Sequence, residues 1–142
     1  MTKVDTLGKK LIIYTDGCSK GNPGPAGIGV AVYQDDGLHL LFAWSDDIGV
    51  TTNNQAEYKA LIAALKYTVD INATEVEIRS DSELIVNQMN GSYRVKKAEL
   101  KPLYTEARRL SASIKNFSIR YIPREQNRQA DALANQAMKE QP

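Results

Sequence analysis

The stretch KLIIYTDGCSKGNPGPAGIGVAVY, residues 10–33, decides the fold of this chain. Its opening run, KLIIYTD, is apolar and ends in a polar pair, which predicts a strand. The following GCSKGNPGP at 17–25 is rich in glycine, proline and asparagine, residues that tolerate the backbone angles of tight turns. A second strand is predicted for AGIGVAVYQ at 26–34, and its small residues indicate close packing against a neighbour. The chain therefore opens with a pair of antiparallel strands.

The pattern downstream of this pair predicts one more strand and then a change of period. After the turn signal DDG at 35–37, LHLLFAWSD at 38–46 predicts a third strand, which completes a meander. From Asn54 to about Thr68, alanine and leucine recur at helical spacing. The remaining predicted elements are a strand at 74–80, a short helix at 80–91, a longer helix at 100–114, a strand at 117–123 and a helix from about Arg128.

This order, βββαβααβα, predicts an α/β fold. Helical crossovers after the third and fourth strands favour parallel pairing of the first, fourth and fifth strands with right-handed connections. The expected result is a five-stranded mixed sheet in the order 3-2-1-4-5, with helices on both faces. A chain of 142 residues suffices for one domain. We expect residues 1–9 to form a flexible leader and residues 10–142 a single domain.

Composition and charge narrow the class of protein. The lone cysteine, Cys18, excludes an intramolecular disulfide and a cysteine-based metal site. No apolar run reaches the roughly 18 residues that span a membrane, and no secretory signal is recognisable, so we expect a cytoplasmic monomer. The net charge is only +1, but residues 94–128 carry ten Lys or Arg against three Asp or Glu. This basic segment is a candidate flank for phosphate binding, with solvated helix faces as the alternative.

Four acidic residues stand inside short polar signatures along the chain. Asp16 ends the first predicted strand and Asp81 follows the fourth, so both are expected at the edge of the sheet where ligands of α/β folds bind. Glu57 and Asp131 can approach from helices on opposite faces. Crowded carboxylates repel one another and raise their own pKa values. Divalent cations would relieve this repulsion, and carboxylate oxygens are ligands that Mg²⁺ prefers.

Each of these acids also has a purely structural explanation. Asn54-x-x-Glu57 and Ser80-x-x-Glu83 match the capping box of a helix start. Asp81 is a possible helix N-cap, and an acid in the first turn of the last helix suits the helix dipole. Asp16 is also suited to begin the turn after the first strand. Taken together these explanations do not account for four acids at one expected edge.

The strings DGCSKGNPGPAG, TTNNQAEY, SDSE and NRQADALAN, in this order and at this spacing, resemble the ribonuclease H family, type 1. The match runs from about Lys10 to Met138. The resemblance implies an endoribonuclease that hydrolyses the RNA strand of RNA–DNA hybrids and leaves 5′-phosphate and 3′-hydroxyl ends. It also implies two Mg²⁺ ions per active site when substrate is bound, with Mn²⁺ able to substitute.

The resemblance assigns roles to individual residues. Asp16 would contact both metal ions, Glu57 and Asp81 would complete one site, and Asp131 would complete the other. Amides that match the family's minor-groove contacts can pair with a ribose 2′-hydroxyl, the group that distinguishes RNA from DNA. Turn formation and helix initiation are the alternative roles of Asn22 and Thr52. The expected substrate-binding residues are Gly17, Cys18, Asn22, Thr52, Asn53, Asn54 and Arg124.

Two departures from the family pattern are visible. Many relatives carry a histidine in the loop before the last acid, whereas the only histidine here is His39, expected in the middle of a strand with a structural role. Arg124 is the candidate replacement; because a guanidinium stays charged it cannot act as a base, so it would contact a phosphate or the leaving group, or simply be solvated. The basic protrusion of some relatives is also missing. The shorter segment GSYRVKKAELK predicts weaker hybrid binding, with possible phosphate contacts from Arg94, Lys96, Lys97 and Lys101.

Two other functions stay open at the level of sequence. One is a catalytically silent nucleic-acid-binding module of the same fold, against which the complete carboxylate set argues. The other is a related fold that acts on a small phosphate monoester, against which the TNN and GNPG motifs argue. Cleavage of duplex RNA, the preferred metal and the biological role are not specified by these motifs.

Overall fold

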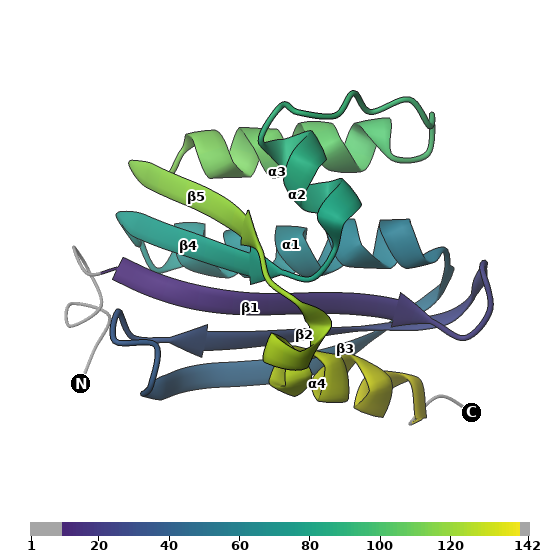
Figure 1. Ribbon diagram of the computed structural model, residues 1–142, viewed down its shortest axis with the longest axis horizontal. Coiled ribbons are helices and arrows are strands. Elements are labelled where there is room, and N and C mark those ends of the chain that lie inside the picture. Colours follow the sequence, from purple (N-terminus) through teal and green to yellow (C-terminus); the bar gives the residue numbers. More distant parts are fainter. Residues whose placement is uncertain (1–9, 140–142) are drawn as a thin grey trace.

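The computed structural model describes residues 10–139 and contains the predicted order of strands and helices (Figure 1). The predictions for residues 1–9 and 140–142 lie outside the described residues. A short 3-10 helix, Arg124–Gln126, precedes the last helix. The elements are β1 (Lys10–Ser19), β2 (Gly24–Tyr33), β3 (Leu40–Thr51), α1 (Asn53–Asp70), β4 (Glu75–Ser80), α2 (Glu83–Met89), α3 (Lys101–Ala112), β5 (Asn116–Tyr121) and α4 (Arg128–Lys139).

The five strands form one mixed sheet in the order β3-β2-β1-β4-β5, as predicted. β1, β2 and β3 pair as an antiparallel meander, and β4 and β5 continue the sheet in parallel with β1. In the β1–β4 pair, Thr15 lies opposite Ser80. The residues that follow these two partners, Asp16 and Asp81, are thereby brought side by side at the carboxyl end of β4.

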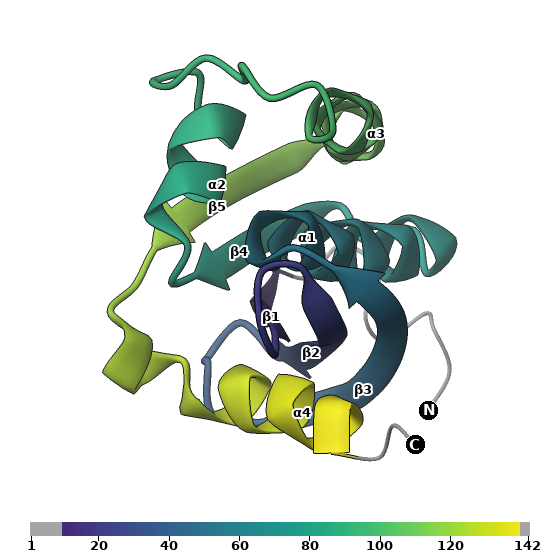
Figure 2. The same ribbon diagram turned by 90° about the vertical axis from the view of Figure 1, so that its right-hand side faces the viewer.

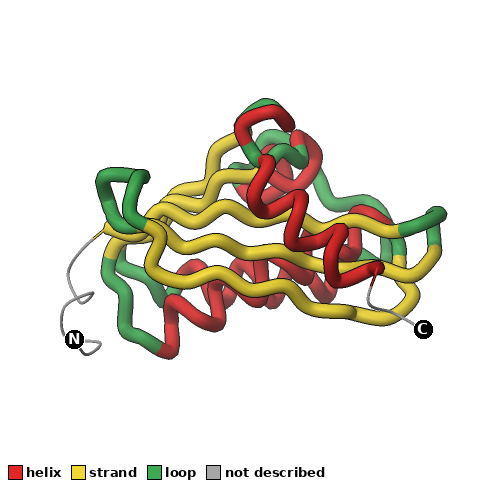
Figure 3. The backbone as a smooth tube through the Cα atoms, turned by 90° about the horizontal axis from the view of Figure 1, so that it is seen from below, coloured by secondary structure: helices red, strands yellow, loops and turns green. Residues whose placement is uncertain are grey.

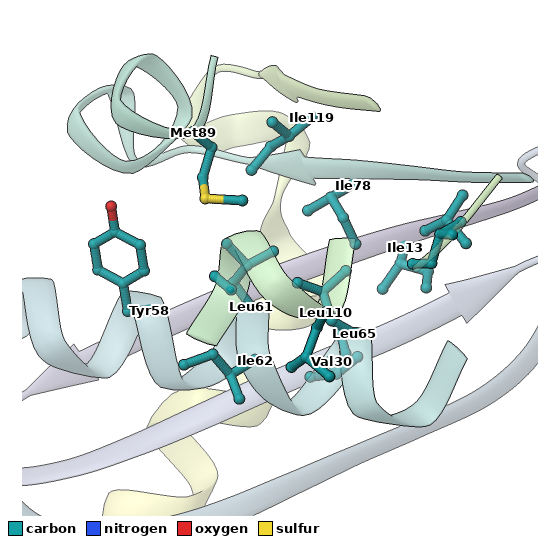
Figure 4. Packing of buried hydrophobic residues seen from close by; sticks show 14 of the residues in the cluster. Ile13, Val30, Tyr58, Leu61, Ile62, Leu65, Ile78, Met89, Leu110 and Ile119 are labelled. Atoms are coloured by element: carbon teal, nitrogen blue, oxygen red, sulfur yellow. The ribbon is translucent and has the colours of Figure 1, made fainter. Parts of the chain in front are cut away.

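Helices cover both faces of the sheet. α1 and α3 lie on one side, and α4 packs on the other side against β2, β1 and β3 (Figures 2 and 3). Ile13, Val30 and Ile78 project from neighbouring strands into the main core (Figure 4). They meet Leu61 and Leu65 of α1, and all five are at most 1% exposed. Burial of each such side chain contributes about 1.5–3 kcal/mol relative to an exposed one.

Two glycines allow helices to approach the sheet closely, and one of them, Gly29, belongs to the small residues noted at 26–34. A Cβ atom at Gly17 would lie 2.2 Å from the backbone of Ala56 in α1. A Cβ atom at Gly29 would lie 2.2 Å from the carbonyl oxygen of Ala130 in α4. Any larger residue would displace backbone at these points, because real Cβ atoms do not approach so closely. The first turns of α1 and α4 are therefore pressed against the middle of the sheet from opposite faces.

The helix caps differ from the prediction. α1 is capped by Thr52, which forms a capping box with Gln55. α2 is capped by Ser82, whose hydroxyl accepts a hydrogen bond from the amide of Ile85 at 3.3 Å. The predicted boxes Asn54-x-x-Glu57 and Ser80-x-x-Glu83, and the cap at Asp81, are therefore wrong. Several polar residues at each helix start can act as a cap, and the backbone path selects among them. Glu57 and Asp81 are thus not engaged in helix capping.

Two further details correct the sequence-based picture. β1 continues to Ser19, so Asp16 lies within a strand and does not begin a turn. His39 lies in the turn before β3, with an exposed side chain that pairs with Asp36, and not in the middle of a strand. No helix within residues 10–139 combines the length and hydropathy needed to cross a membrane.

Candidate metal centre

The four predicted acids converge on one cleft. Ligand oxygens of Asp16, Glu57 and Asp81 all lie within 4.8 Å of one another. Asp131 reaches the same cleft from the first turn of α4. The cleft has a volume of about 530 Å³ and is lined by all four residues.

Each carboxylate is held by a different element. Asp16 is only 4% exposed because it lies inside β1 with α4 packed over its face of the sheet. Glu57, near the start of α1, accepts a hydrogen bond at 2.9 Å from the backbone N–H of Gly17. Asp81 follows the last residue of β4, and Asp131 lies in the first turn of α4. The site is thus assembled from two adjacent strands and from helices on both faces of the sheet.

The electrostatics of the cluster favour cation binding. Burial, and then the charges of Glu57 and Asp81, raise the pKa of Asp16 to about 10. Burial and the charge of Asp81 raise the pKa of Glu57 to about 8, against the opposing hydrogen bond from Gly17. Burial also raises the pKa of Asp81. Carboxyls that hold protons near neutral pH become charged when a cation binds, because metal binding to such groups releases protons.

The donor set fits divalent cations with a preference for hard oxygen ligands. All four donors are carboxylates, and the ion pair nearest to them is that of Arg124 with Asp131, whose Nη2 and Oδ1 atoms lie 3.6 Å apart. The Arg124 side chain is 78% exposed, so its compensation of the buried charge is weak. Mg²⁺ and Mn²⁺ prefer such oxygen ligands, whereas the described residues bring no cysteine or histidine into the cluster of three acids.

Comparison with known proteins places the chain in a family. Residues 14–137 match a family model described as reverse transcriptase-like. Over 131 residues the chain is 41% identical to ribonuclease HI of Halobacterium salinarum, a match that covers 92% of this chain and 65% of that protein. The crystal structure of RNase H1 from the same organism has a TM-score of 0.89 and covers 93% of this chain and 99% of that one, at 40% identity. The chain belongs to the type 1 ribonuclease H family.

Other matches to the ribonuclease H family agree. The chain is 43% identical over 129 residues to the bifunctional protein Rv2228c of Mycobacterium tuberculosis. This match covers 91% of the chain but only 35% of that protein. The crystal structure of LC11-RNase H1, a protein isolated from compost, in complex with an RNA/DNA hybrid has a TM-score of 0.86 at 46% identity. That match covers 91% of this chain and 96% of the other. The resemblance inferred from the motifs, and the fold that it implied, are confirmed.

The residues expected to bind substrate in a ribonuclease H form a connected rim beside the carboxylates. The backbone N–H of Asn53 donates to Asn22 Oδ1 at 3.0 Å, and the backbone N–H of Ser19 donates to Asn53 Oδ1 at 2.8 Å. These bonds join the β1–β2 loop to the start of α1. Thr52 serves as the helix cap, in line with its alternative role. Gly17, Cys18, Asn53 and Asn54 line the carboxylate cleft.

The remaining predicted residues occupy two places. Arg124 lines the carboxylate cleft. Four cations between the end of α2 and the first residue of α3, here called the basic connector, lie instead around two hollows of about 490 and 630 Å³ beside these helices. They are Arg94, Lys96, Lys97 and Lys101. Tyr93 lines both hollows and is 47% exposed. The connector is therefore a surface separate from the carboxylate cleft.

Two asparagines at the site were not identified from the sequence. Asn135, one helical turn after Asp131, donates from Nδ2 to the Asp131 carboxylate at 3.2 Å. Asn127, which precedes α4, is 1% exposed and donates to the carbonyl oxygen of Thr15 at 2.9 Å. The i to i+4 spacing of Asn135 from Asp131 was available as a signal. The side chain of Asn127 gave no such signal, because its acceptor on Thr15 lies 112 positions away in the chain.

Proposed function

We propose that this protein is a metal-dependent endoribonuclease that hydrolyses the RNA strand of RNA–DNA hybrids. The observation that carries the proposal is the convergence of three carboxylates within 4.8 Å, with Asp131 beside them. A binding module would gain nothing from this arrangement, because four converging carboxylates repel a phosphate backbone. The hybrid bound by the relative LC11-RNase H1, at 46% identity, supports the same substrate.

The four carboxylates would hold two Mg²⁺ ions, and Mn²⁺ is expected to substitute. Asp16 is the most buried of the four acids. Its strand β1 lies beside β4, which Asp81 follows, and between the helices α1 and α4, which carry Glu57 and Asp131. This central position suits a ligand shared by both ions. Glu57 and Asp81 would complete one site and Asp131 the other. Two such ions, when bound, supply an activated water and stabilise the leaving 3′-oxygen. Cleavage would leave 5′-phosphate and 3′-hydroxyl ends.

The asparagine rim would recognise the RNA strand. Asn53 turns its amide oxygen towards Ser19, so its NH₂ group can donate towards the cleft. Asn54 and the backbone of Cys18 line the same cleft and can contact the minor groove. An amide can bind the ribose 2′-hydroxyl that DNA lacks. Asn22 would act both as a substrate contact and as the partner that holds the backbone of Asn53.

Arg124 and the basic connector would contact phosphate groups. The exposed guanidinium of Arg124 lies at the mouth of the cleft and stays charged, so we assign it to the scissile phosphate or the leaving group and not to proton transfer. The connector lies at a distance from the carboxylates and would bind the flank of the duplex. The resulting contacts are electrostatic and carry no sequence information.

The test is cleavage of a labelled RNA–DNA hybrid beside matched duplex RNA and duplex DNA, with Mg²⁺, with Mn²⁺ and with EDTA. We expect metal-dependent cleavage of the RNA strand of the hybrid. Asp16→Asn should abolish cleavage, whereas Asp35→Asn, in the exposed β2–β3 turn, should leave it unchanged. Hybrid binding that survives EDTA without any cleavage would instead support a silent binding module. Full activity of Asp16→Asn would refute the metal assignment.

A further inference from the structure

Asn127 occupies a point where the elements that carry three of the four acids meet. Its side chain is buried, at 1% exposure, between the end of the loop after β5 and the strands of the sheet. Nδ2 donates to the carbonyl oxygen of Thr15 at 2.9 Å. Thr15 directly precedes Asp16 and lies opposite Ser80, the residue before Asp81. The asparagine therefore touches the sheet at the junction from which both strand carboxylates project.

The same residue is linked to the two other acids of this group. Its side chain lies close enough to Asp81 to lower the pKa of that carboxyl, against the larger effect of burial. Its backbone carbonyl oxygen accepts the N–H of Asp131 at 3.1 Å, in the first turn of α4. One residue thus contacts the backbone beside Asp16 and the backbone of Asp131, and its side chain acts on the pKa of Asp81. Each of these contacts crosses between different elements or starts a helix that carries a ligand.

The orientation of the Asn127 side-chain amide lowers the stability of the fold, because it leaves the amide oxygen without a hydrogen-bond partner. The Thr15 carbonyl is an acceptor, so the NH₂ group must face it. The amide oxygen of Asn127 is then left as the one buried side-chain polar atom without a partner among residues 10–139. A buried acceptor without a partner is unfavourable. An apolar side chain of similar shape would avoid this cost but would leave the Thr15 carbonyl without its donor and Asp81 without a polar neighbour that lowers its pKa.

We propose that Asn127 is a positioning residue that fixes Asp16, Asp81 and Asp131 relative to one another for divalent-cation binding. The inference rests on the proposed metal-dependent function and names the residue that supports its ligands from behind. Partners that orient metal ligands contribute strongly to affinity, and their removal typically costs about 10–100-fold in metal binding or activity. Asn127 does not line the cleft itself, so its effect on substrate binding is indirect.

The test compares Asn127→Ala with a matched control, Asn90→Ala. Asn90 makes the same kind of contact, from its Nδ2 to the carbonyl oxygen of Ile119 at 3.1 Å, but at the end of α2. Mn²⁺ binding in the absence of nucleic acid is measured by calorimetry, and hybrid cleavage is measured against Mg²⁺ concentration. For Asn127→Ala we expect a Kd for Mn²⁺ raised about 10–100-fold. We expect cleavage to recover at high Mg²⁺ and KM for hybrid to stay unchanged. Asn90→Ala should alter neither the affinity for Mn²⁺ nor the dependence of cleavage on Mg²⁺ concentration.

A second variant separates positioning from packing. Asn127→Leu keeps the number of heavy atoms and the branched shape of the side chain and removes the unpaired oxygen, so we expect a folded protein with the same loss of Mn²⁺ affinity. Mn²⁺ affinity in both variants within twofold of the wild type would overturn the positioning role while leaving the proposed function intact. If the wild-type protein binds no Mn²⁺ and cleaves no hybrid, the proposed function fails first and the inference fails with it.

Discussion

The buried carboxyl of Asp16 predicts that removing it stabilises the metal-free protein. Its pKa is raised from 3.8 to about 10 by burial and by neighbouring carboxylates. In EDTA at pH 7 the folded protein keeps Asp16 protonated, whereas the unfolded chain ionises it. Because the unfolded state gains stability from this ionisation, the free energy of unfolding falls as pH rises from about 4 towards 10.

The magnitude follows from the same linkage. At pH 7 the unfolded chain is about three pH units above the ordinary pKa of Asp16, and each unit is worth about 1.4 kcal/mol. The full effect is therefore about 4 kcal/mol. Neighbouring carboxyls share part of this cost, so we expect Asp16→Asn to raise the free energy of unfolding by about 1–4 kcal/mol in EDTA. Asparagine is neutral at every pH, so the variant removes this titration.

Urea unfolding in EDTA between pH 4 and 8 measures this effect. The gain from Asp16→Asn should be close to zero at pH 4 and should grow with pH. Saturating Mg²⁺ should reverse the order of stability, because only the wild type retains the full ligand set. Asp35→Asn, in an exposed turn, should show neither trend. A variant that is less stable than the wild type in EDTA at pH 7, or a gain independent of pH, would refute the reasoning.

Three further outcomes are expected. Mn²⁺ binding at pH 7 should release about two protons, since the pKa values of Asp16 and Glu57 are about 10 and about 8. At pH 9 Glu57 is already ionised before binding, so the number should fall to about one. Calorimetry in buffers of different ionisation enthalpy measures the number of protons released. Gly29→Ala places a Cβ 2.2 Å from the Ala130 carbonyl oxygen, so it should cost about 1–3 kcal/mol in urea unfolding and reduce cleavage by displacing α4. An unchanged stability would show that α4 shifts freely. Neutralising the four cations of the basic connector should flatten the dependence of hybrid affinity on salt concentration, measured by titration, while metal binding stays unchanged. An unaltered salt dependence would show that the connector does not contact the hybrid.

Much of this architecture was predictable from the sequence because it depends on local patterns. An apolar run in 10–16 and alternating apolar residues in 74–80 identified strands, and helical spacing after Asn54 identified α1. Chain order and right-handed crossovers then determined the strand order, since few other topologies satisfy both. The four acids were identified by their place at strand ends and helix starts.

Other features depended on contacts between residues far apart in the chain. The helix caps moved to Thr52 and Ser82, because the backbone path selects among neighbouring polar residues. The basic connector lies beside α2 and α3 because it joins them in the chain, but its separation from the carboxylate cleft followed from the packing of these helices.

The sequence by itself determined which ligands exist, because the carboxylates and the order of the strands are local and topological properties of the chain. Only the tertiary structure decided how these ligands are supported. Asn127 contacts Thr15, which lies 112 positions away, and Gly29 lets the backbone of α4 approach to within 2.2 Å of where a Cβ atom would stand. Contacts of this kind leave no periodic trace in the sequence, because they are set by how closely folded elements approach and by which buried polar atoms must find partners.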